Sequence, residues 1–323
     1  MSSKLLDSLR LNIPEVLNNI AVGYSNNALI GTEIFPLVKT KTESVLAPVF
    51  GKGHLRIYES ERAPRAHARI VASDDISSVT INLEEQTLTK RFDIREIKAA
   101  QDNGNLIDIV STNTKSLIDS LLLRREYLIA DMLQTAANFA SGMKVDLSGS
   151  DQFTHANSSP LVIIQAGIDA MKAKGVTANT ISFGFDAWKS FKAHADVITA
   201  IFGPYVPGIP NEDKVAELFS TEKNKVTVKV GQSILENSLG VITDIWKDNV
   251  VLARVAEGRG DQANQYTASA GYSFQLDNTS GPMVVSGWED PITKKIFMIN
   301  ATMTMKVAML MQDALYLIED TNV

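Results

Sequence analysis

The stretch "STNTKSLIDSLLLRREYLIADMLQTAANFA", Ser111 to Ala140, decides the fold. It contains no proline and no glycine, so nothing in it interrupts a helix. Polar residues recur along it at spacings of four and three and form one narrow stripe: Ser120, Arg124, Tyr127, Asp131, Gln134 and Asn138. The flanks of this stripe are mostly apolar. We therefore predict a helix over 111–140 that other parts of the chain cover on most of its circumference.

The predicted helix is long for a protein of 323 residues. At about 1.5 Å per residue it spans more than the diameter of a small domain. Ser111 or Thr112 is expected to cap its first turn, and Gly142 is expected to end it. A coiled coil is the alternative, but no heptad register persists on both sides of the helix.

The chain before this helix has apolar residues but little local structure to pack them against. Residues 1–40 hold short helical fragments broken at Pro14 and Pro36, which is typical of an arm that lies on another surface. Residues 41–95 are predicted to be extended, and "SVTINLEEQTLTKRF" (78–92) alternates as in a two-stranded ribbon. Such a ribbon is marginal alone in water, so it needs a partner surface.

The chain after the helix predicts a compact lobe and a β-rich end. Strands and helices mix over 178–260, which favours an α+β lobe, and "NTISF" (179–183) is predicted to be a buried strand. In the last fifty residues, apolar residues alternate with polar ones. This alternation, of period two, predicts a strand with one buried face: Met303, Met305, Val307, Met309 and Met311.

Residue patterns for catalysis or metal binding are missing from the sequence. There are no cysteines, no G-x-S-x-G motif, and no two histidines at metal-ligand spacing. We therefore assign no catalytic, cofactor-binding or metal-binding residue, and we expect a packing or surface role for His194. The net charge of −6 does not favour a basic nucleic-acid-binding face. No apolar run is long enough to predict a transmembrane helix.

One local charge pattern lies in the predicted ribbon. Five basic residues, opposed by Glu59 and Glu61, give a surplus of three positive charges: Lys52, Arg56, Arg62, Arg65 and Arg69. One interpretation is an edge kept soluble by charge. The other is docking of the ribbon on an acidic neighbouring subunit, because arginine binds carboxylates with two parallel hydrogen bonds. The sequence leaves both open.

The order of these parts resembles the major capsid proteins of tailed bacteriophages, which share the Hong Kong 97-type shell fold. Local sequences agree, and together they cover nearly the whole chain: "NNIAVGYSNNALIGTEIFPLVKTKTES" (18–44), "LLLRREYLIADML" (121–133), "ANTISFGFDAWKSFKAHADVI" (178–198) and "ALYLIED" (314–320). In the third of these, Asn179, Gly184, Trp188 and His194 stand at matching places, whereas Ala195 replaces a common proline. Positions for a covalent cross-link cannot be matched.

The resemblance implies an α+β fold with named parts. These are an N-terminal arm (1–40), an extended E-loop hairpin (41–92), a P-domain (93–177 and 270–323) and an A-domain (178–269), with the helix as spine. It implies a chain that self-assembles into pentamers and hexamers of an icosahedral head shell, assembled in the host cytoplasm and present in the virion. The shell would enclose double-stranded DNA without sequence-specific binding.

Further partners implied by the resemblance are a separate scaffolding protein, a portal and a decoration protein. No membrane partner is expected. The main alternative is an encapsulin-type bacterial compartment, which has the same fold. An unrelated α+β enzyme and a phage tail or decoration protein are weaker alternatives, because the sequence offers no convergent polar pocket for the first, and the second class rarely carries such a helix.

Overall fold

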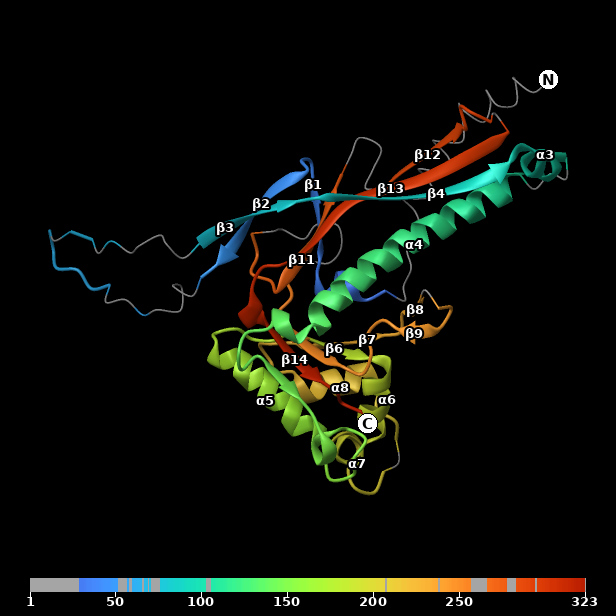
Figure 1. The fold of residues 1–323 in the computed structure, drawn as a ribbon. Coiled ribbons are helices and arrows are strands. Elements are labelled where there is room, and N and C mark those ends of the chain that lie inside the picture. Colours follow the sequence, from blue (N-terminus) through green and yellow to red (C-terminus); the bar gives the residue numbers. More distant parts are fainter. Residues whose placement is uncertain are drawn as a thin grey trace.

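The computed structural model describes residues 29–322 with short gaps: 52–56, 58, 59, 66, 69, 71–75, 103–105, 207, 238, 257–265, 278–282 and 294. Most of the predicted arm lies outside the described residues. In the described part, a long helix lies along one sheet, a second sheet with helices lies beneath its C-terminal end, and a ribbon projects to one side (Figure 1).

The long helix, α4, runs from Leu106 to Gln134. The predicted helix therefore exists, but both predicted ends are wrong. Ser111 and Thr112 lie inside the helix and do not cap it. At the other end the chain turns into a short 3-10 helix, Ala136–Asn138, well before Gly142.

Side chains explain the early end of α4. The Thr135 hydroxyl donates to the carbonyl oxygen of Asp131 at 2.7 Å, and the Asn138 amide donates to that of Met132 at 2.9 Å. Carbonyl groups of the last helical turn thus have hydrogen-bond partners even though the helix does not continue.

The two faces of α4 follow the predicted pattern, with one exception. Ser120, Arg124, Tyr127 and Asp131 are exposed. Gln134, at the end of the predicted polar stripe, is buried. On the flanks, residues such as Ile129 are fully buried, which confirms that other chain covers most of the helix.

The first sheet has five strands, in the order β1-β11-β13-β12, with β4 paired along the other side of β13. Their bounds are β1 Leu37–Thr40, β4 Glu84–Asp93, β11 Gly271–Leu276, β12 Val284–Glu289 and β13 Ile296–Met309. Every second residue of β13 from Phe297 to Val307 is buried, which confirms the predicted alternation for Met303, Met305 and Val307. It is wrong for the last two methionines: Met309 ends the strand and is only half-buried, and Met311 lies beyond it. Met303 and Met305 face α4 within this core.

The second sheet also has five strands, in the order β5-β14-β10-β6-β7. Their bounds are β5 Lys144–Asp146, β6 Thr180–Gly184, β7 Thr227–Gly231, β10 Val250–Ala253 and β14 Leu315–Glu319. The helices around it are α5 Pro160–Ala173, α6 Phe185–Ala193, α7 Ala195–Phe202 and α8 Glu212–Phe219. All of β6 is buried, as predicted for "NTISF". The domain boundaries stay a prediction.

The ribbon is formed by β2 (Ser44–Phe50) and β3 (Ile76–Asn82), which pair with each other alone. The prediction that 78–92 runs along one ribbon is wrong in its second half. The run divides at Leu83, and β4 joins the sheet of β13 instead. The remaining elements are short: α2 Gly31–Ile34, α3 Ile94–Asp102, β8 Ile234–Glu236, β9 Ile242–Asp244 and the 3-10 helices Gly149–Asp151 and Gln312–Ala314.

Candidate assembly surfaces

A buried carboxylate on α4 joins three distant parts of the chain. Glu126 is only 2% exposed. Its Oε1 accepts hydrogen bonds from the Ile30 backbone N–H at 3.1 Å and from Trp246 Nε1 at 2.8 Å, and its Oε2 accepts from the Gly31 N–H at 2.8 Å. The start of α2 and the segment before β10 are therefore both tied to the long helix at one point. We call these four residues the spine junction.

The environment of Glu126 acts on its charge in two directions. Burial raises the pKa of the carboxyl group, while the hydrogen bonds from Trp246, Gly31 and Ile30 oppose that rise. The approach of Gly31 is close, because a Cβ at that position would lie 2.6 Å from Glu126 Oε2. Only glycine permits this contact without movement of the carboxylate.

A second buried polar side chain of α4 supports the same segment. The Gln134 amide donates to the Ile245 carbonyl at 2.8 Å, and its oxygen accepts from Asn249 at 3.1 Å. The sequence pattern predicted neither contact, and it placed Gln134 on the polar stripe. Glu126 lies four residues after Leu122 and three before Ile129, so a charge on an apolar helical face was the available signal.

The ribbon is anchored through part of its surface, and other apolar side chains on it are not covered. Val45, Ala47 and Ile81 are buried against the aromatic side chains of β11. In the same part of the ribbon, Leu46, which lies between Val45 and Ala47 on the opposite face, is 62% exposed, and Val79, the strand partner of Ala47, is 49% exposed. Apolar side chains on both faces of the ribbon thus remain in contact with water in the isolated chain.

The basic residues predicted to make intersubunit contacts lie beyond the strands of the ribbon. Arg62 and Arg65 are exposed, and Arg65 has a positive φ of 66° in a turn. Lys52, Arg56 and Arg69 lie outside the described residues. Ile57 and Ile70 flank this region and are 100% and 93% exposed. The contact made by the five basic residues stays a prediction.

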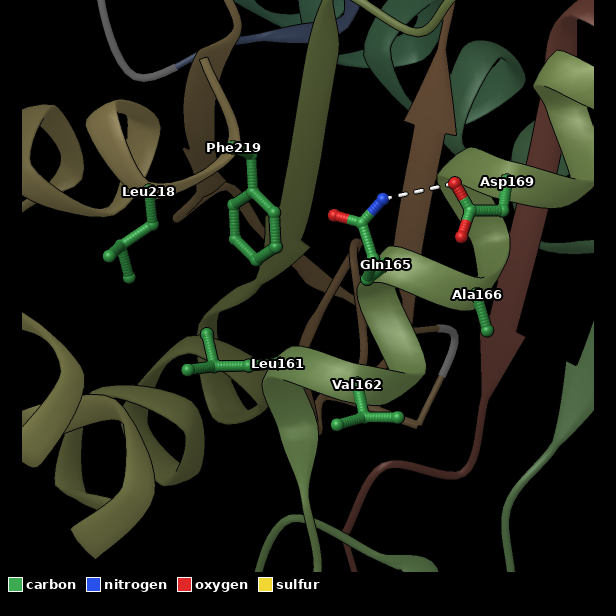
Figure 2. A pocket seen from close by; sticks show the side chains of 7 residues that line it. All are labelled: Leu161, Val162, Gln165, Ala166, Asp169, Leu218 and Phe219. Atoms are coloured by element: carbon green, nitrogen blue, oxygen red, sulfur yellow. Dashed lines mark hydrogen bonds between the residues drawn. The ribbon is translucent and has the colours of Figure 1, made fainter. Parts of the chain in front are cut away.

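An apolar groove of about 400 Å³ lies between α5 and α8. Figure 2 shows Leu161, Val162, Gln165, Ala166 and Asp169 on α5 opposite Leu218 and Phe219 at the end of α8. The Gln165 amide donates to Asp169 Oδ1 at 3.1 Å, so these two polar groups partly satisfy each other. Val162 is 67% exposed in this groove.

The β8–β9 hairpin is another region with exposed apolar side chains. Its turn is held by Asn237, whose side-chain oxygen accepts from the N–H groups of Leu239 at 2.9 Å and Val241 at 3.0 Å. Gly240 supplies the positive φ of 76° that the turn requires. The hairpin carries four exposed apolar side chains: Ile234, Leu239, Val241 and Ile242.

Of the described histidines, His194 has a clear structural role. His194 is buried and precedes α7, where its Nδ1 accepts from the Asp196 N–H at 3.3 Å. The predicted packing role of His194 is therefore confirmed. Within the described ranges, no group of three or more His, Cys, Asp or Glu side chains is placed to hold a metal ion. No helix in the same ranges is long and apolar enough to cross a membrane.

Comparison with solved structures shows the fold. A phage-related protein from Bordetella bronchiseptica RB50 superposes with a TM-score of 0.72 at 21% identity, covering 95% of this chain and 97% of that one. A putative prophage capsid protein from E. coli CFT073 gives 0.60 at 12% identity, covering 96% and 99%. The SrpI encapsulin of Synechococcus elongatus PCC 7942 gives 0.51 at 10% identity, covering 90% and 86%. Fold alone does not separate phage shells from encapsulins.

Sequence similarity distinguishes phage shell proteins from encapsulins for this chain. No family profile matches the chain. The major capsid protein of Burkholderia phage BcepMu is 34% identical over 319 residues, which cover 98% of this chain and 99% of that protein. The chain therefore belongs to the phage major capsid proteins with a Hong Kong 97-like α+β fold, and is a structural component of the head shell of a tailed phage rather than an enzyme.

Proposed function

We propose that this chain builds its shell from pentamers and hexamers, with each part of the fold in a separate role. The arm (1–40) and the E-loop (41–92) extend over neighbouring copies. The P-domain (93–177 and 270–323) forms the wall around the spine helix, and the A-domain (178–269) meets its copies around the five-fold and six-fold axes. The order of elements along the chain and the self-assembly of this family support this division.

The exposed apolar side chains of the ribbon are the single observation that carries the proposal. Leu46 and Val79 lie among the anchored residues Val45, Ala47 and Ile81, yet they are 62% and 49% exposed. A two-stranded ribbon gains most of its stability from a surface that covers it. A neighbouring copy supplies such a surface in a closed ring, where the same head-to-tail contact repeats.

The basic residues of the ribbon give this contact its electrostatic part. Lys52, Arg56, Arg62, Arg65 and Arg69 concentrate positive charge on a chain with 37 acidic and 31 basic residues. An acidic neighbour is therefore the expected partner. Arginine side chains bind exposed carboxylates in a fixed, two-pronged geometry, which adds register as well as affinity.

The test replaces Arg62 and Arg65 together with alanine and measures the yield of shells by sedimentation. We expect a lower yield and an unchanged unfolding curve of the dissociated chain, because both side chains are exposed. Two control variants separate charge from geometry. Arg62→Lys with Arg65→Lys keeps the charge, and Lys174→Ala with Lys223→Ala removes equal charge elsewhere on the surface. An unchanged yield in the alanine variant contradicts the docking role.

The remaining proposed partners act on the whole shell. A separate scaffolding protein and a portal take part in assembly in the host cytoplasm, and a decoration protein binds the finished shell. Double-stranded DNA is held inside without sequence-specific contacts. The net charge of −6 supports the last point, because an acidic inner surface repels packaged DNA and prevents adhesion. A strongly basic inner surface in a map of the shell would contradict it.

A further inference from the structure

We propose that the open edge of β4 pairs with the same edge of a second copy, antiparallel and about a two-fold axis. The occupant of this edge is thus β4 of another copy. The contact differs from those within a ring, because a surface that binds itself closes after two copies, whereas a ring joins two unlike surfaces. We place it between neighbouring rings, and in that placement the inference rests on the proposed function.

β4 has one edge without a partner strand in the described chain. Its ten residues pair with β13 on one side (Figure 1), and no described strand pairs with the other side. The Ile94 N–H donates to the Lys295 carbonyl, next to β13, at 2.9 Å. Because backbone groups alternate between the two edges of a strand, the even-numbered residues of β4 bond toward β13. The open edge offers the N–H and C=O groups of the odd-numbered ones: Glu85, Thr87, Thr89 and Arg91.

Contacts within the chain bound the open edge at both ends. The Leu83 N–H donates to the Glu43 carbonyl at 2.8 Å, and the Asp93 N–H donates to Glu96 Oε2 at 3.4 Å. Leu88 is therefore the midpoint of the open stretch. Two identical stretches that pair antiparallel are symmetric about their midpoint, which places Leu88 of one copy opposite Leu88 of the other.

The exposed side chains of β4 match each other in this register. Glu85 lies three residues before Leu88 and Arg91 three residues after it, so each Glu85 faces an Arg91 of the other copy. Thr87 and Thr89 are opposed in the same way. The Thr87 hydroxyl donates to Glu85 Oε1 at 2.9 Å, which orients the carboxylate and leaves its second oxygen for the arginine. Opposite charges and threonine pairs at directly opposed positions both stabilise antiparallel strands.

The register also keeps the same face of both sheets on the same side. Leu88 is the strand partner of Ala301, which packs in the core between β13 and α4, so Leu88 shares the face toward α4. It is 38% exposed in the single chain, and the second Leu88 across the axis would cover it. A two-fold axis perpendicular to the sheet leaves both α4 helices on one side, as two subunits of one shell require.

Other registers lack this match. A shift of two residues in one direction places Glu85 opposite Asp93, so that like charges meet. A shift in the other direction places Arg91 opposite Leu83, whose N–H is already bound. A shift of one residue brings side chains of opposite faces together. Charges on an edge strand commonly prevent pairing, but here their order along β4 permits pairing with one partner in one register.

The test uses the absence of native cysteines, which makes a single new cysteine a specific probe. Leu88→Cys is produced in the full chain with the other head proteins of its phage, and the purified shells are mildly oxidised. Opposed residues without mutual hydrogen bonds have Cα atoms about 4.5 Å apart, a distance that a disulfide spans. We expect most chains to run as linked pairs on a non-reducing denaturing gel, with no larger species.

Gln86→Cys is the matched control for the register, because it lies on the same strand and the same face. Its two copies would be about 13 Å apart in the proposed pair, at about 3.3 Å per residue, which is beyond the reach of a disulfide. We expect it to stay unlinked. A linked Gln86→Cys chain beside an unlinked Leu88→Cys chain would contradict the register.

The outcomes separate this inference from the proposed function. Intact shells in which Leu88→Cys stays unlinked overturn the pairing and leave the rings in place. This includes the cases in which the chain's own arm or another head protein lies on the edge of β4. A wild-type chain that forms neither rings nor shells overturns the proposed function itself.

Charge reversal tests the pairing in a chain without cysteine, and it decides the case in which Leu88→Cys does not assemble. Glu85→Arg places like charges opposite each other and is expected to lower the yield of shells by about threefold or more. Adding Arg91→Glu restores opposite charges and should return the yield to within about twofold of wild type. Both side chains are exposed, so the unfolding midpoint of the dissociated chain should not change. A wild-type yield from Glu85→Arg, or no recovery in the double variant, would contradict the inference.

Discussion

At the residue scale, Glu126 shows why one carboxylate can be required within an apolar helix face. All three of its partners, the N–H groups of Ile30, Gly31 and Trp246, are donors. A carboxylate group has only hydrogen-bond acceptors, so both of its oxygens can accept from these N–H donors. An amide of the same shape would turn its own NH₂ group toward one of these donors. The requirement is therefore for the charge state and not for the volume.

Glu126→Gln is expected to lower the free energy of unfolding by about 1–3 kcal/mol, the range for a buried donor left without a partner. Denaturant unfolding of the dissociated chain measures this change. Asp131→Asn is the control, because Asp131 is an exposed carboxylate of the same helix and its loss should alter stability by less than about 0.5 kcal/mol. Equal stability of the glutamine variant and the wild type would refute the donor-matching argument.

Tyr272 is expected to make the stability of the chain depend on pH in alkaline solution. Burial raises the pKa of its hydroxyl from 10.0 to about 12, and the hydroxyl donates to the Thr267 carbonyl at 2.7 Å. The folded state thus holds the proton more tightly than the unfolded state. The stabilisation that comes from the protonated Tyr272 hydroxyl is present below pH about 10 and is lost as the pH rises toward about 12. Melting temperatures of wild type and Tyr272→Phe, measured from pH 8 to 12, should therefore converge as the pH rises.

At the element scale, α4 is covered by the rest of the chain on most of its circumference. The first sheet covers its N-terminal half through residues such as Leu117, and the second sheet covers its C-terminal half through residues such as Leu133. One element thus belongs to both cores. Damage to the buried face of α4 should consequently affect the whole chain and not one sheet.

Ile129→Asp tests this role of α4. The side chain is fully buried, so an unpaired carboxylate there should cost several kcal/mol, comparable to the stability of a domain. We expect insoluble or unfolded protein in circular dichroism and sedimentation. Ser120→Asp places the same charge on the exposed stripe of the same helix and should fold normally. A soluble Ile129→Asp variant that unfolds cooperatively would show that this face is not buried.

At the scale of the whole molecule, the chain leaves much of its apolar surface for other copies. The ribbon, the β8–β9 hairpin and the α5–α8 groove are separate exposed apolar regions on one subunit. Each contact alone is modest, but closure of a shell makes many of them simultaneous. The single chain is therefore expected to be less protected than the same chain in a shell.

Limited trypsin digestion measures this difference. In dissociated chains we expect rapid cleavage after Arg62 and Arg65, which are exposed beyond the anchored base of the ribbon. In assembled shells the same bonds should be cut at least about tenfold more slowly, because a neighbour covers them. Mass spectrometry of the fragments identifies the cleavage points. If free chain and shell were cut at these two bonds at the same rate, the ribbon would have no intersubunit cover.

Local patterns in the sequence were sufficient for several elements of the fold. The run without proline or glycine predicted α4, and the alternation around Met303 and Met305 predicted the buried face of β13. These patterns depend on residues that are neighbours along one element. The similarity of quoted motifs to phage capsid proteins also indicated the family, which the relative at 34% identity established.

The sequence by itself thus determined which segments are helix or strand and which faces are apolar, because periodicity is a local property. Only the tertiary structure decided that β4 pairs with β13, since alternation does not identify the partner strand. It also decided where α4 ends, because Thr135 and Asn138 bind its last carbonyl groups. Glu126 gained its role in the same way: its donors lie 95, 96 and 120 positions away, and only folding brings them together.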